Sequence, residues 1–339
     1  LSSNSLLRLE RCCRIMTDKR ISLAPMMGMT DRHFRFMASL LCEKISLYTP
    51  MIHVDAILQS EKNFLERENK DSRAVAIQIA GNDSTSVSEA SKIIEQCNYN
   101  EINLNIGCPS ERVQNCKVGA ALMDEPKTVG RMVESIRNTC DLPVTIKTRL
   151  GIDDFDSYEF LCEFIETTSK YGCDHYILHA RKALLNGLSP KENRSIPPIN
   201  YSRVYKIKEQ YSDLTIEING EIKKIHEIKE HCEHVDGVMI GREACNNPLF
   251  LRVITSSIYQ DSPMEMTDFF ERMFEYIIKE SKNGTGVHFI TRHMTTLFKG
   301  MSGAKEWRNL VGGLDSKKSN AEDLVRSMRL FVEERVTQH

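Results

Sequence analysis

One cysteine of this chain stands where catalysis could use it. Cys108 lies in the turn Asn105-Ile-Gly-Cys-Pro-Ser110, which directly follows an apolar stretch. Most free cysteines are small buried hydrophobic residues, but a thiol on a tight turn after a strand faces whatever lies beyond the strand end. No neighbouring side chain marks it as a thiolate nucleophile, and a neutral thiol can release a proton near neutral pH. We therefore predict that Cys108 is a general acid.

Polar side chains also recur at regular spacing in the apolar stretches around this turn. In Glu101-Ile-Asn-Leu-Asn105 the polar residues share one parity, which places Asn103 and Asn105 on one face of a strand. Other stretches present further polar residues near their ends, namely Gln78; Thr145, Lys147 and Arg149; and His175 and His179. A buried amide or ammonium must be satisfied by another side chain or by a ligand. A single such residue is usually a satisfied core residue, but their convergence favours a ligand site.

The elements that position these residues alternate between short apolar stretches and longer helical ones, as in a parallel sheet of βα units. The apolar stretches are 21–25, 47–49, 74–80, 101–105, 144–149, 175–180, 215–219 and 237–240. Eight strands fit an α/β fold of the (β/α)8 TIM barrel type, over residues 20–250. A doubly wound sheet would open with G-x-G-x-x-G, which the sequence lacks.

The ends of the last two predicted strands resemble a phosphate site. Asn219-Gly220 ends the seventh strand and Gly241-Arg242 the eighth. Barrels commonly bind phosphate here, through glycine N–H groups and a nearby cation. Each dipeptide alone is equally well explained as an ordinary glycine turn. Together, with Lys147 across the same mouth, they predict a phosphorylated cofactor such as flavin mononucleotide (FMN).

After Asn247-Pro248 only helical periodicity remains, which predicts a small C-terminal helical bundle domain, residues 264–339. Its apolar stripes are Phe270, Met273, Phe274 and Ile277; Ile290, His293, Met294, Leu297 and Phe298; and Leu324, Met328 and Phe331. Ser319 and Glu322 have the spacing of a capping box. Trp307, the lone tryptophan, either stacks on a ligand or anchors the bundle core.

Basic residues cluster after the sixth predicted strand. Between Arg181 and Lys208 there is one acid, Glu192, and the basic residues are Arg181, Lys182, Lys191, Arg194, Arg203, Lys206 and Lys208. A solvated surface is the usual explanation of such a run, but beside the mouth of a barrel a polyanionic substrate is an equal alternative. The helical domain adds Lys299, Lys305, Arg308, Lys317 and Lys318.

The overall composition predicts a globular protein outside the membrane. Hydrophobic residues make up 41% of the chain and charged residues 27%, and the formal net charge is −2. This balance gives no global sign of nucleic-acid binding, so such a partner must be held by a local patch. The 11 cysteines include no Cys-x-x-Cys pair, so neither a disulfide framework nor a structural zinc site is indicated. We predict no metal site, no obligate protein partner and a monomer.

Residues 1–19 are predicted to be an N-terminal extension, either disordered or targeting. Arg8, Arg11, Arg14 and Lys19 give it a faint likeness to an organellar transit peptide, and a frayed terminus is the alternative. We expect a cytoplasmic protein, with a mitochondrial or plastid location as the alternative.

Taken together, the motifs of this chain resemble those of the tRNA-dihydrouridine synthases, most closely the A branch, over about residues 20 to 310. The matching pieces are Ala24-Pro-Met-Met27, Thr30-Asp-Arg-His33, Leu47-Tyr-Thr49, Gln78-Ile-Ala80, Glu101-Ile-Asn-Leu-Asn-Ile-Gly-Cys-Pro-Ser110, Arg112-Val-Gln114, Val144-Thr-Ile-Lys-Thr-Arg149, Gly151-Ile-Asp-Asp154, His179-Ala-Arg-Lys182, Gly187-Leu-Ser-Pro-Lys-Glu-Asn-Arg194, Ile218-Asn-Gly220 and Val238-Met-Ile-Gly-Arg242. The chain departs from the family pattern at Gly28, Met29, Pro50, Cys116 and Glu221, the last standing where a second glycine is usual.

The resemblance implies a barrel that binds FMN and a helical domain that helps to hold tRNA. By position, the cofactor-binding residues are Pro25, Met26, Met27, Gln78, Lys147, His179, Asn219, Gly220, Glu221, Gly241 and Arg242. Cys108 is the catalytic acid. The residues implied to contact tRNA are Asn105, Lys191, Glu192, Arg194, Lys305 and Arg308.

The implied reaction is the NADPH-dependent reduction of a D-loop uridine to 5,6-dihydrouridine, at positions 20 and 20a. NADPH reduces FMN, flavin N5 delivers hydride to C6, and Cys108 protonates C5, while Lys147 stabilises the anionic reduced flavin. One alternative is a dihydroorotate-dehydrogenase-like FMN barrel that acts on a small molecule, which leaves the basic run and the appended helices unexplained. The other is a tRNA-binding protein with secondary catalysis.

Overall fold

The protein's structure, a computed structural model, describes residues 20–59, 62–69, 75–110, 116–312 and 320–336. These residues divide into two units. One holds residues 20–28 with Ser46–Gly241, and the other holds Met29–Ile45 with the chain from Arg242 onward. The N-terminal extension and the residues Arg112, Gln114, Lys317, Lys318 and Ser319 lie outside the described residues.

A nine-stranded parallel sheet forms the first unit, with its strands hydrogen-bonded in the order β1, β9, β8, β7, β6, β5, β4, β2, and with β3 paired to β4. The strands are β1 (Arg20–Leu23), β2 (Leu47–Tyr48), β3 (Ile52–His53), β4 (Val75–Ala80), β5 (Glu101–Ile106), β6 (Val144–Thr148), β7 (His175–His179), β8 (Thr215–Asn219) and β9 (Gly237–Ile240). Each of the eight predicted stretches overlaps one of these strands. The two-residue strand β3 was not predicted from the sequence.

The sheet closes because β1, at one end of the strand order, also bonds to the residue just before β2, the strand at the other end. On one side β1 lies in register with β9, with Leu23 opposite Ile240. On the other, Leu23 donates its N–H to the carbonyl of Ser46 at 2.8 Å, and Ser46 donates to the carbonyl of Ile21 at 2.9 Å. The predicted (β/α)8 barrel is therefore confirmed.

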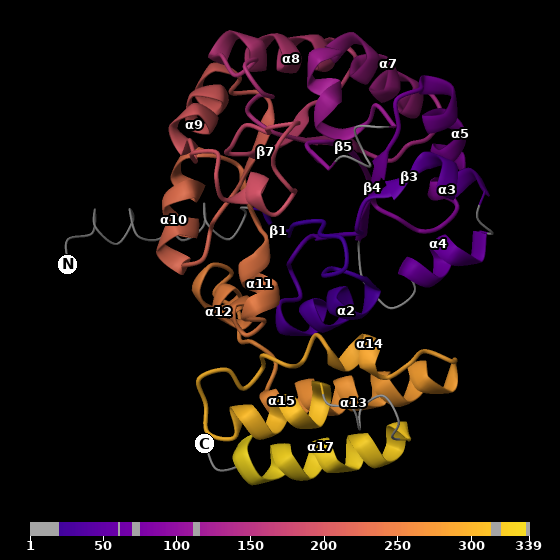
Figure 1. Ribbon diagram of the computed structural model, residues 1–339, viewed down its shortest axis with the longest axis vertical. Coiled ribbons are helices and arrows are strands. Elements are labelled where there is room, and N and C mark those ends of the chain that lie inside the picture. The colour runs from indigo at the N-terminus through magenta and orange to yellow at the C-terminus, as the bar shows by residue number, and fades with distance from the viewer. Residues whose placement is uncertain (1–19, 60–61, 70–74, 111–115, 313–319, 337–339) are drawn as a thin grey trace. The chain divides into compact units, whose positions relative to one another are not determined.

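Helices connect the strands and run around the outside of the barrel (Figure 1). They are α3 (Val54–Gln59), α4 (Lys62–Asn69), α5 (Ser84–Glu95), η1 (Gly119–Asp124), α7 (Pro126–Arg137), α8 (Tyr158–Lys170), η2 (Glu192–Arg194), α9 (Tyr201–Gln210) and α10 (Ile225–His234). Asp83, Ser157 and Asn200 start α5, α8 and α9 as N-caps, each accepting a backbone N–H of the first turn. Pro126 occupies the first turn of α7, where no N–H is needed.

Successive side chains of each strand point alternately out toward the helices and into the barrel, which determines the residues that fill its interior. Outward-facing residues such as Ile102 and Leu104 are buried under the helices. Inward-facing residues include an apolar cluster of Ala24, Tyr48, Ala76, Ile177 and Met239. On the same inward parity, the barrel also carries charged and amide side chains, which form the candidate site and its supports.

The second unit is helical and includes a segment from early in the sequence. Its helices are α2 (Arg32–Leu41), α11 (Arg242–Asn246), α12 (Phe250–Ser257), α13 (Met266–Lys282), α14 (His288–Thr291), α15 (Ala304–Gly312) and α17 (Ala321–Val336). Arg32 at the start of α2 forms an ion pair with Glu280 on α13, and Phe36 stacks on Tyr276 at 3.9 Å between ring centroids. The sequence did not indicate that residues 29–45 pack with the C-terminal helices.

Apart from the half-buried His293, the predicted apolar stripes are buried in this unit, but the second stripe does not form one regular helix. Regular α-helix ends at Thr291, and turns with hydrogen bonds three residues apart continue through Met294 and Leu297. Trp307 is fully buried and donates its indole N–H to the carbonyl of Met294 at 2.7 Å. Its ring packs 4.9 Å from that of Phe298, so Trp307 anchors the core of the helical unit. Among the described residues, no helix has the length and apolar character needed to cross a membrane.

Candidate active site at the barrel mouth

Lys147 lies at the centre of the polar residues on the carboxyl ends of the strands. Its ammonium donates to Oδ1 of Asn219 on β8 at 3.2 Å, and its strand partner is Asn105 on β5. Burial and, to a smaller extent, the neighbouring charge of Arg149 lower the pKa of Lys147 to about 7. An anionic ligand beside this ammonium would stabilise its charged form.

His179 lies at the end of β7, next to the loop after β8. A Cβ atom on Gly220 would come within 3.1 Å of the His179 ring, so this position allows no side chain without a shift. Burial, together with the positive charges of Arg149 and Lys147, holds the pKa of His179 well below its usual value. The imidazole is therefore neutral at physiological pH, and can donate with one ring nitrogen and accept with the other.

The turn that carries Cys108 is fixed from two sides. Oδ1 of Asn105 accepts the N–H groups of Gly107 at 3.1 Å and of Cys108 at 3.0 Å. Arg149 donates its Nε–H to the carbonyl of Gly107 at 3.1 Å. The Cys108 carbonyl accepts the N–H of Ala120 at 3.0 Å, and its free thiol is half-buried. The structure thus holds the partly accessible thiol of Cys108 on a turn of defined shape.

Gln78 joins this turn to the barrel interior. It is buried on β4, where its Nε2 donates to Oδ1 of Asn103 at 2.7 Å and its Oε1 accepts from Nδ2 of Asn105 at 2.8 Å. The family resemblance implies that Asn105 contacts tRNA. In this structure its side-chain amide is hydrogen-bonded to Gln78 and to the N–H groups of Gly107 and Cys108.

The glycines at the ends of the last two strands differ in the space around them, and only Gly241 has open space beside it. A Cβ atom on Gly241 would meet nothing closer than Ala24 Cβ and Met26 Sδ, both at 3.8 Å. Gly220 has φ +130°, and its carbonyl accepts the hydroxyl of Tyr201 at 2.7 Å. Arg242 is the first residue of α11 and belongs to the second unit.

Glu221 occupies a conformation that suits glycine. Its φ is +53°, in the left-handed region, in keeping with the expectation of a second glycine here. Its carboxylate forms an ion pair with the buried guanidinium of Arg181 at 2.6 Å. The Glu221 carboxylate is therefore already paired within the protein. The backbone of this turn remains as the part that can face a phosphate.

Pro25, Met26 and Met27 follow β1. Met26 packs against the apolar cluster in the barrel interior, whereas Met27 is 69% exposed. Pro25 is half-buried, so all three residues keep some exposed apolar surface at this strand end, which suits contact with an aromatic ring system.

Most of the basic run is engaged in contacts within the first unit. Lys182 pairs with Asp156 and Lys208 with Asp236, both at 2.9 Å. The remaining engaged residues are Arg181, paired with Glu221; Arg203, donating to the carbonyl of Asp156; and Lys206, 3.9 Å above the Tyr158 ring. The run is therefore less of an open cationic surface than its sequence suggests.

The residues implied to bind tRNA differ in exposure. Lys191 and Glu192 are exposed on the loop after β7, where the Glu192 carboxylate accepts the N–H of Ser189 at 2.8 Å, and Arg194 is half-buried. In the second unit, Lys305 and Arg308 are exposed on α15. Among the described residues, no group of His, Cys, Asp or Glu is arranged to hold a metal ion.

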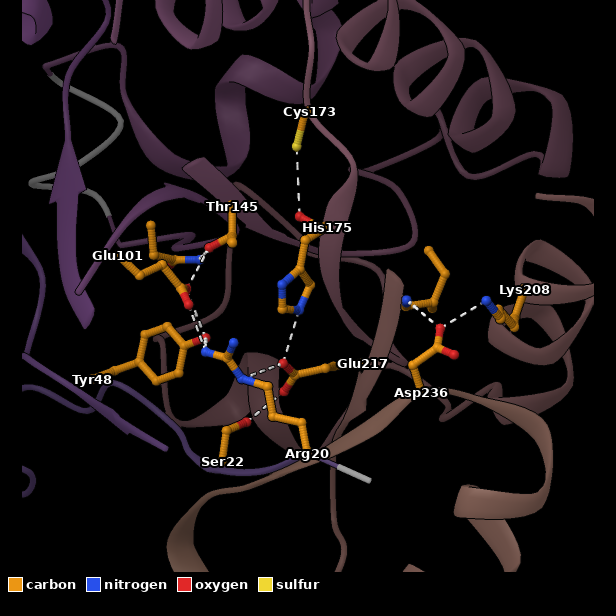
Figure 2. A network of polar contacts seen from close by, with 12 residues as sticks. Arg20, Ser22, Tyr48, Glu101, Thr145, Cys173, His175, Lys208, Glu217 and Asp236 are labelled. Atoms are coloured by element: carbon orange, nitrogen blue, oxygen red, sulfur yellow. Dashed lines mark hydrogen bonds and ion pairs between the residues drawn. The ribbon is translucent and has the colours of Figure 1, made fainter. Parts of the chain in front are cut away.

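Sequence reasoning missed a buried charge network below the mouth, here called the floor network (Figure 2). Arg20 on β1 lies between two carboxylates, 2.6 Å from Glu101 and 3.0 Å from Glu217. Glu217 also bonds to His175 at 2.8 Å and accepts the hydroxyl of Ser22 at 2.5 Å. Glu101 lies two residues before Asn103 on β5, and Glu217 two residues before Asn219 on β8, so both glutamates face the barrel interior. This alternation could have identified them as inward-facing charged residues from the sequence.

The charge of Glu217 is stabilised by its partners. Burial alone would raise its pKa, but the hydrogen bond and charge of His175 and the charge of Arg20 outweigh burial and lower it. The floor network therefore holds an ionised carboxylate inside the barrel at neutral pH.

The comparisons with known proteins agree on one family. The family model described as "Dihydrouridine synthase (Dus)" matches residues 22–332. The tRNA-dihydrouridine(20/20a) synthase of Escherichia coli (strain K12) is 46% identical over 295 residues, which cover 86% of this chain and 85% of the relative. That of Vibrio vulnificus (strain CMCP6) is also 46% identical, over 86% of this chain and 90% of its own. That of Yersinia pestis is 44% identical, over 86% and 85%.

A solved structure of a 2-naphthoyl-CoA reductase complex is also similar in fold. It aligns with a TM-score of 0.53 and 10% sequence identity, over 72% of this chain and 51% of that chain. At this identity the likeness concerns the fold alone.

The lowered pKa of Glu217 predicts a pH-dependent contribution to stability. Because the pKa is lower in the folded than in the unfolded protein, the stabilisation is present above the ordinary glutamate pKa and is lost as the pH falls through the folded value. Glu217→Gln should therefore reduce the free energy of unfolding at pH 7 by about 3–5 kcal/mol, and by less at pH 4. Urea unfolding followed by far-UV circular dichroism measures both. Glu89→Gln, at an exposed glutamate on α5, is the control and should change neither value; an equal loss at both pH values in Glu217→Gln would contradict the linkage.

Proposed function

The chain belongs to the dihydrouridine synthase family, and we propose that it reduces uridine to 5,6-dihydrouridine at positions 20 and 20a of tRNA, as the names of its relatives state for them. The observation that carries this proposal is the arrangement of Cys108 and Lys147 at one barrel mouth. Their strands are neighbours, and the register pairs Lys147 with Asn105, whose amide shapes the Cys108 turn. A proton donor and a partly buried ammonium thus lie at the ends of neighbouring strands.

We infer that FMN is the cofactor and that the mouth residues fit it. The partly buried Lys147 ammonium has a neutral amide oxygen as its hydrogen-bond acceptor, and burial lowers its pKa, so an anionic group bound beside it would stabilise its charged form. The open space over Gly241 accommodates a group that approaches the backbone closely. In this proposal, Gln78 and Lys147 contact the flavin ring, Pro25, Met26 and Met27 line it, and His179, Asn219, Gly220, Glu221, Gly241 and Arg242 hold its edge and phosphate. Bound FMN would supply to C6 of the uracil a hydride that originates from NADPH.

Cys108 supplies the proton at C5 in this proposal. Its turn receives hydrogen bonds from Ala120 and Arg149 and donates two to Asn105, so its backbone position is set before any substrate arrives. A thiol held in place can protonate one face of the base while hydride arrives at the adjacent carbon. Lys147 stabilises negative charge that develops near it, because a partly buried ammonium interacts strongly with an anion.

The decisive experiment is a product assay with the purified full chain, NADPH and tRNA transcripts. We expect dihydrouridine at positions 20 and 20a, detected by nuclease digestion and mass spectrometry, and none in a transcript with cytidine at both positions. A purified protein with a flavin absorbance band near 450 nm that oxidises NADPH but leaves tRNA unmodified would favour the small-molecule alternative. Reduction confined to other uridines would overturn the assigned positions.

Replacing the proposed acid should affect one half of the reaction. Cys108→Ala should slow uridine reduction by about 10²- to 10⁴-fold, because a positioned general acid contributes that much, and should leave flavin binding and NADPH oxidation unchanged. Stopped-flow absorbance follows the two half-reactions separately. Cys116→Ala, at an exposed cysteine, is the matched control and should behave as wild type. Equal slowing of both half-reactions by Cys108→Ala would argue against the proton-donor role.

The proposed tRNA contacts predict a salt dependence. If Lys305 and Arg308 each neutralise a phosphate, alanine at either position should reduce the slope of log affinity against log salt by about 0.7–0.9. Lys191→Ala and Arg194→Ala should do the same in the barrel unit. Filter binding at several salt concentrations gives the slopes. Lys282→Ala, at another exposed lysine of the helical unit, should leave the slope unchanged; wild-type slopes in all four test variants would exclude these residues as phosphate contacts.

A further inference from the structure

A continuous chain of hydrogen bonds joins the floor network to the Cys108 turn. It runs from Glu101 to Thr145, Asn103, Gln78 and Asn105, with every link between 2.7 and 2.8 Å. The last link, from Asn105 to the N–H groups of Gly107 and Cys108, is 3.1 and 3.0 Å. The chain crosses three neighbouring strands, β4, β5 and β6, in which Asn103 is the register partner of both Gln78 and Thr145.

The chemistry of its two ends fixes the direction of this chain. At one end the Glu101 carboxylate, paired with Arg20, can only accept, so Thr145 must donate its hydroxyl proton to it. The Thr145 oxygen then accepts from the Asn103 amide nitrogen, which turns the Asn103 oxygen toward Gln78. Tyr48, whose pKa is held well above its usual value by burial and by the nearby carboxylates, keeps its proton and also donates to Glu101 (Figure 2).

At the other end the Gly107 and Cys108 N–H groups can only donate, so Asn105 must present its oxygen to them and its amide nitrogen to Gln78. Gln78 accepts from that nitrogen and donates to Asn103. Both ends therefore require the same orientation of all three amides. Reversing any one amide would place two donors or two acceptors face to face.

We propose that Thr145 and Glu101 are positioning residues for the reaction: through the one-way chain of Asn103, Gln78 and Asn105, they fix the geometry of the turn that presents Cys108. Neither side chain need touch the substrate. Thr145 is the link at which the charged floor network meets the neutral amides, and it is 1% exposed. This role for catalysis rests on the proposed function, whereas the effect on the turn can be measured without it.

The test compares Thr145→Val, which removes the hydroxyl but keeps the shape, with Thr145→Ser, which restores it. Thr168→Val is the matched control, because Thr168 is also a buried threonine of the barrel unit, and its hydroxyl bonds to Phe164 and Tyr176 outside the chain. Hydrogen exchange of the full protein, followed by mass spectrometry, reports on the Gly107 and Cys108 amides. A peptide from β8 reports on global opening.

In Thr145→Val we expect exchange at Gly107 and Cys108 to be about tenfold faster, with the β8 peptide unchanged, because the amide chain that supports Asn105 loses its connection to the floor network. Thr145→Ser and Thr168→Val should match wild type. Gln78→Met, which removes the middle of the chain at similar length, should also speed exchange and keeps the test open if Thr145→Val does not fold. Wild-type exchange in Thr145→Val, or equal acceleration in Thr168→Val, would overturn the proposal.

The activity arm uses single-turnover uridine reduction. Thr145→Val should slow it by about 10- to 100-fold, and Thr145→Ser should restore it, since a small displacement of a reacting group has an effect of this size. Normal reduction in Thr145→Val despite faster exchange would overturn the catalytic role of the chain. An inactive wild-type protein would instead refute the proposed function, while the exchange measurement would still decide whether the chain holds the turn.

Discussion

The placement of the Arg20 guanidinium between the carboxylates of Glu101 and Glu217 is the interaction on which the rest of the barrel depends. Three ionised groups inside a barrel are tolerated only if each is paired and its remaining hydrogen-bonding capacity is used. Ser22, Tyr48, Thr145 and His175 supply further hydrogen bonds to the two carboxylates. Because a carboxylate only accepts, each of the hydroxyl neighbours must donate to it. The side-chain amides of Asn103, Gln78 and Asn105 can then adopt only one orientation.

The two ends of the barrel therefore differ in electrostatics. In the floor network, the Glu101 and Glu217 carboxylates both form direct ion pairs with Arg20. At the mouth, Lys147 and Arg149 bond to neutral oxygens, and their charges together with burial keep His179 uncharged. A mouth with this excess of positive charge attracts anions, and the neutral His179 adds a donor and an acceptor without adding repulsion. The electrostatic gradient follows from strand parity, because one face of β5 supplies Glu101 at one end and Asn105 at the other.

Much of this architecture was predictable from the sequence, for physical reasons. Apolar strands separated by amphipathic helices give the strand order, and residue parity gives the inward-facing Asn103, Asn105 and Lys147. The packing of residues 29–45 with the C-terminal helices was not predictable, because it depends on contacts such as that of Phe36 with Tyr276, which are distant in sequence. The charge count after β7 was misleading as well, since Lys182 and Lys208 find acidic partners that only the fold brings near. The structure also decides the role of Trp307, whose indole N–H is taken by a backbone carbonyl.

The turn after β8 shows how a departure from the family pattern is accommodated. A non-glycine residue at φ +53° is strained by roughly 1 kcal/mol, so Glu221 must be stabilised by a specific contact. Its partner Arg181 is buried and also donates to the carbonyls of Ser195 and Pro197, on the loop that follows Lys191 and Arg194. Glu221 thus ties the proposed phosphate end of the cofactor site to the loop proposed to contact tRNA. A glycine here would relieve the strain, but it would leave the Arg181 guanidinium without its carboxylate and that loop less firmly attached to the barrel.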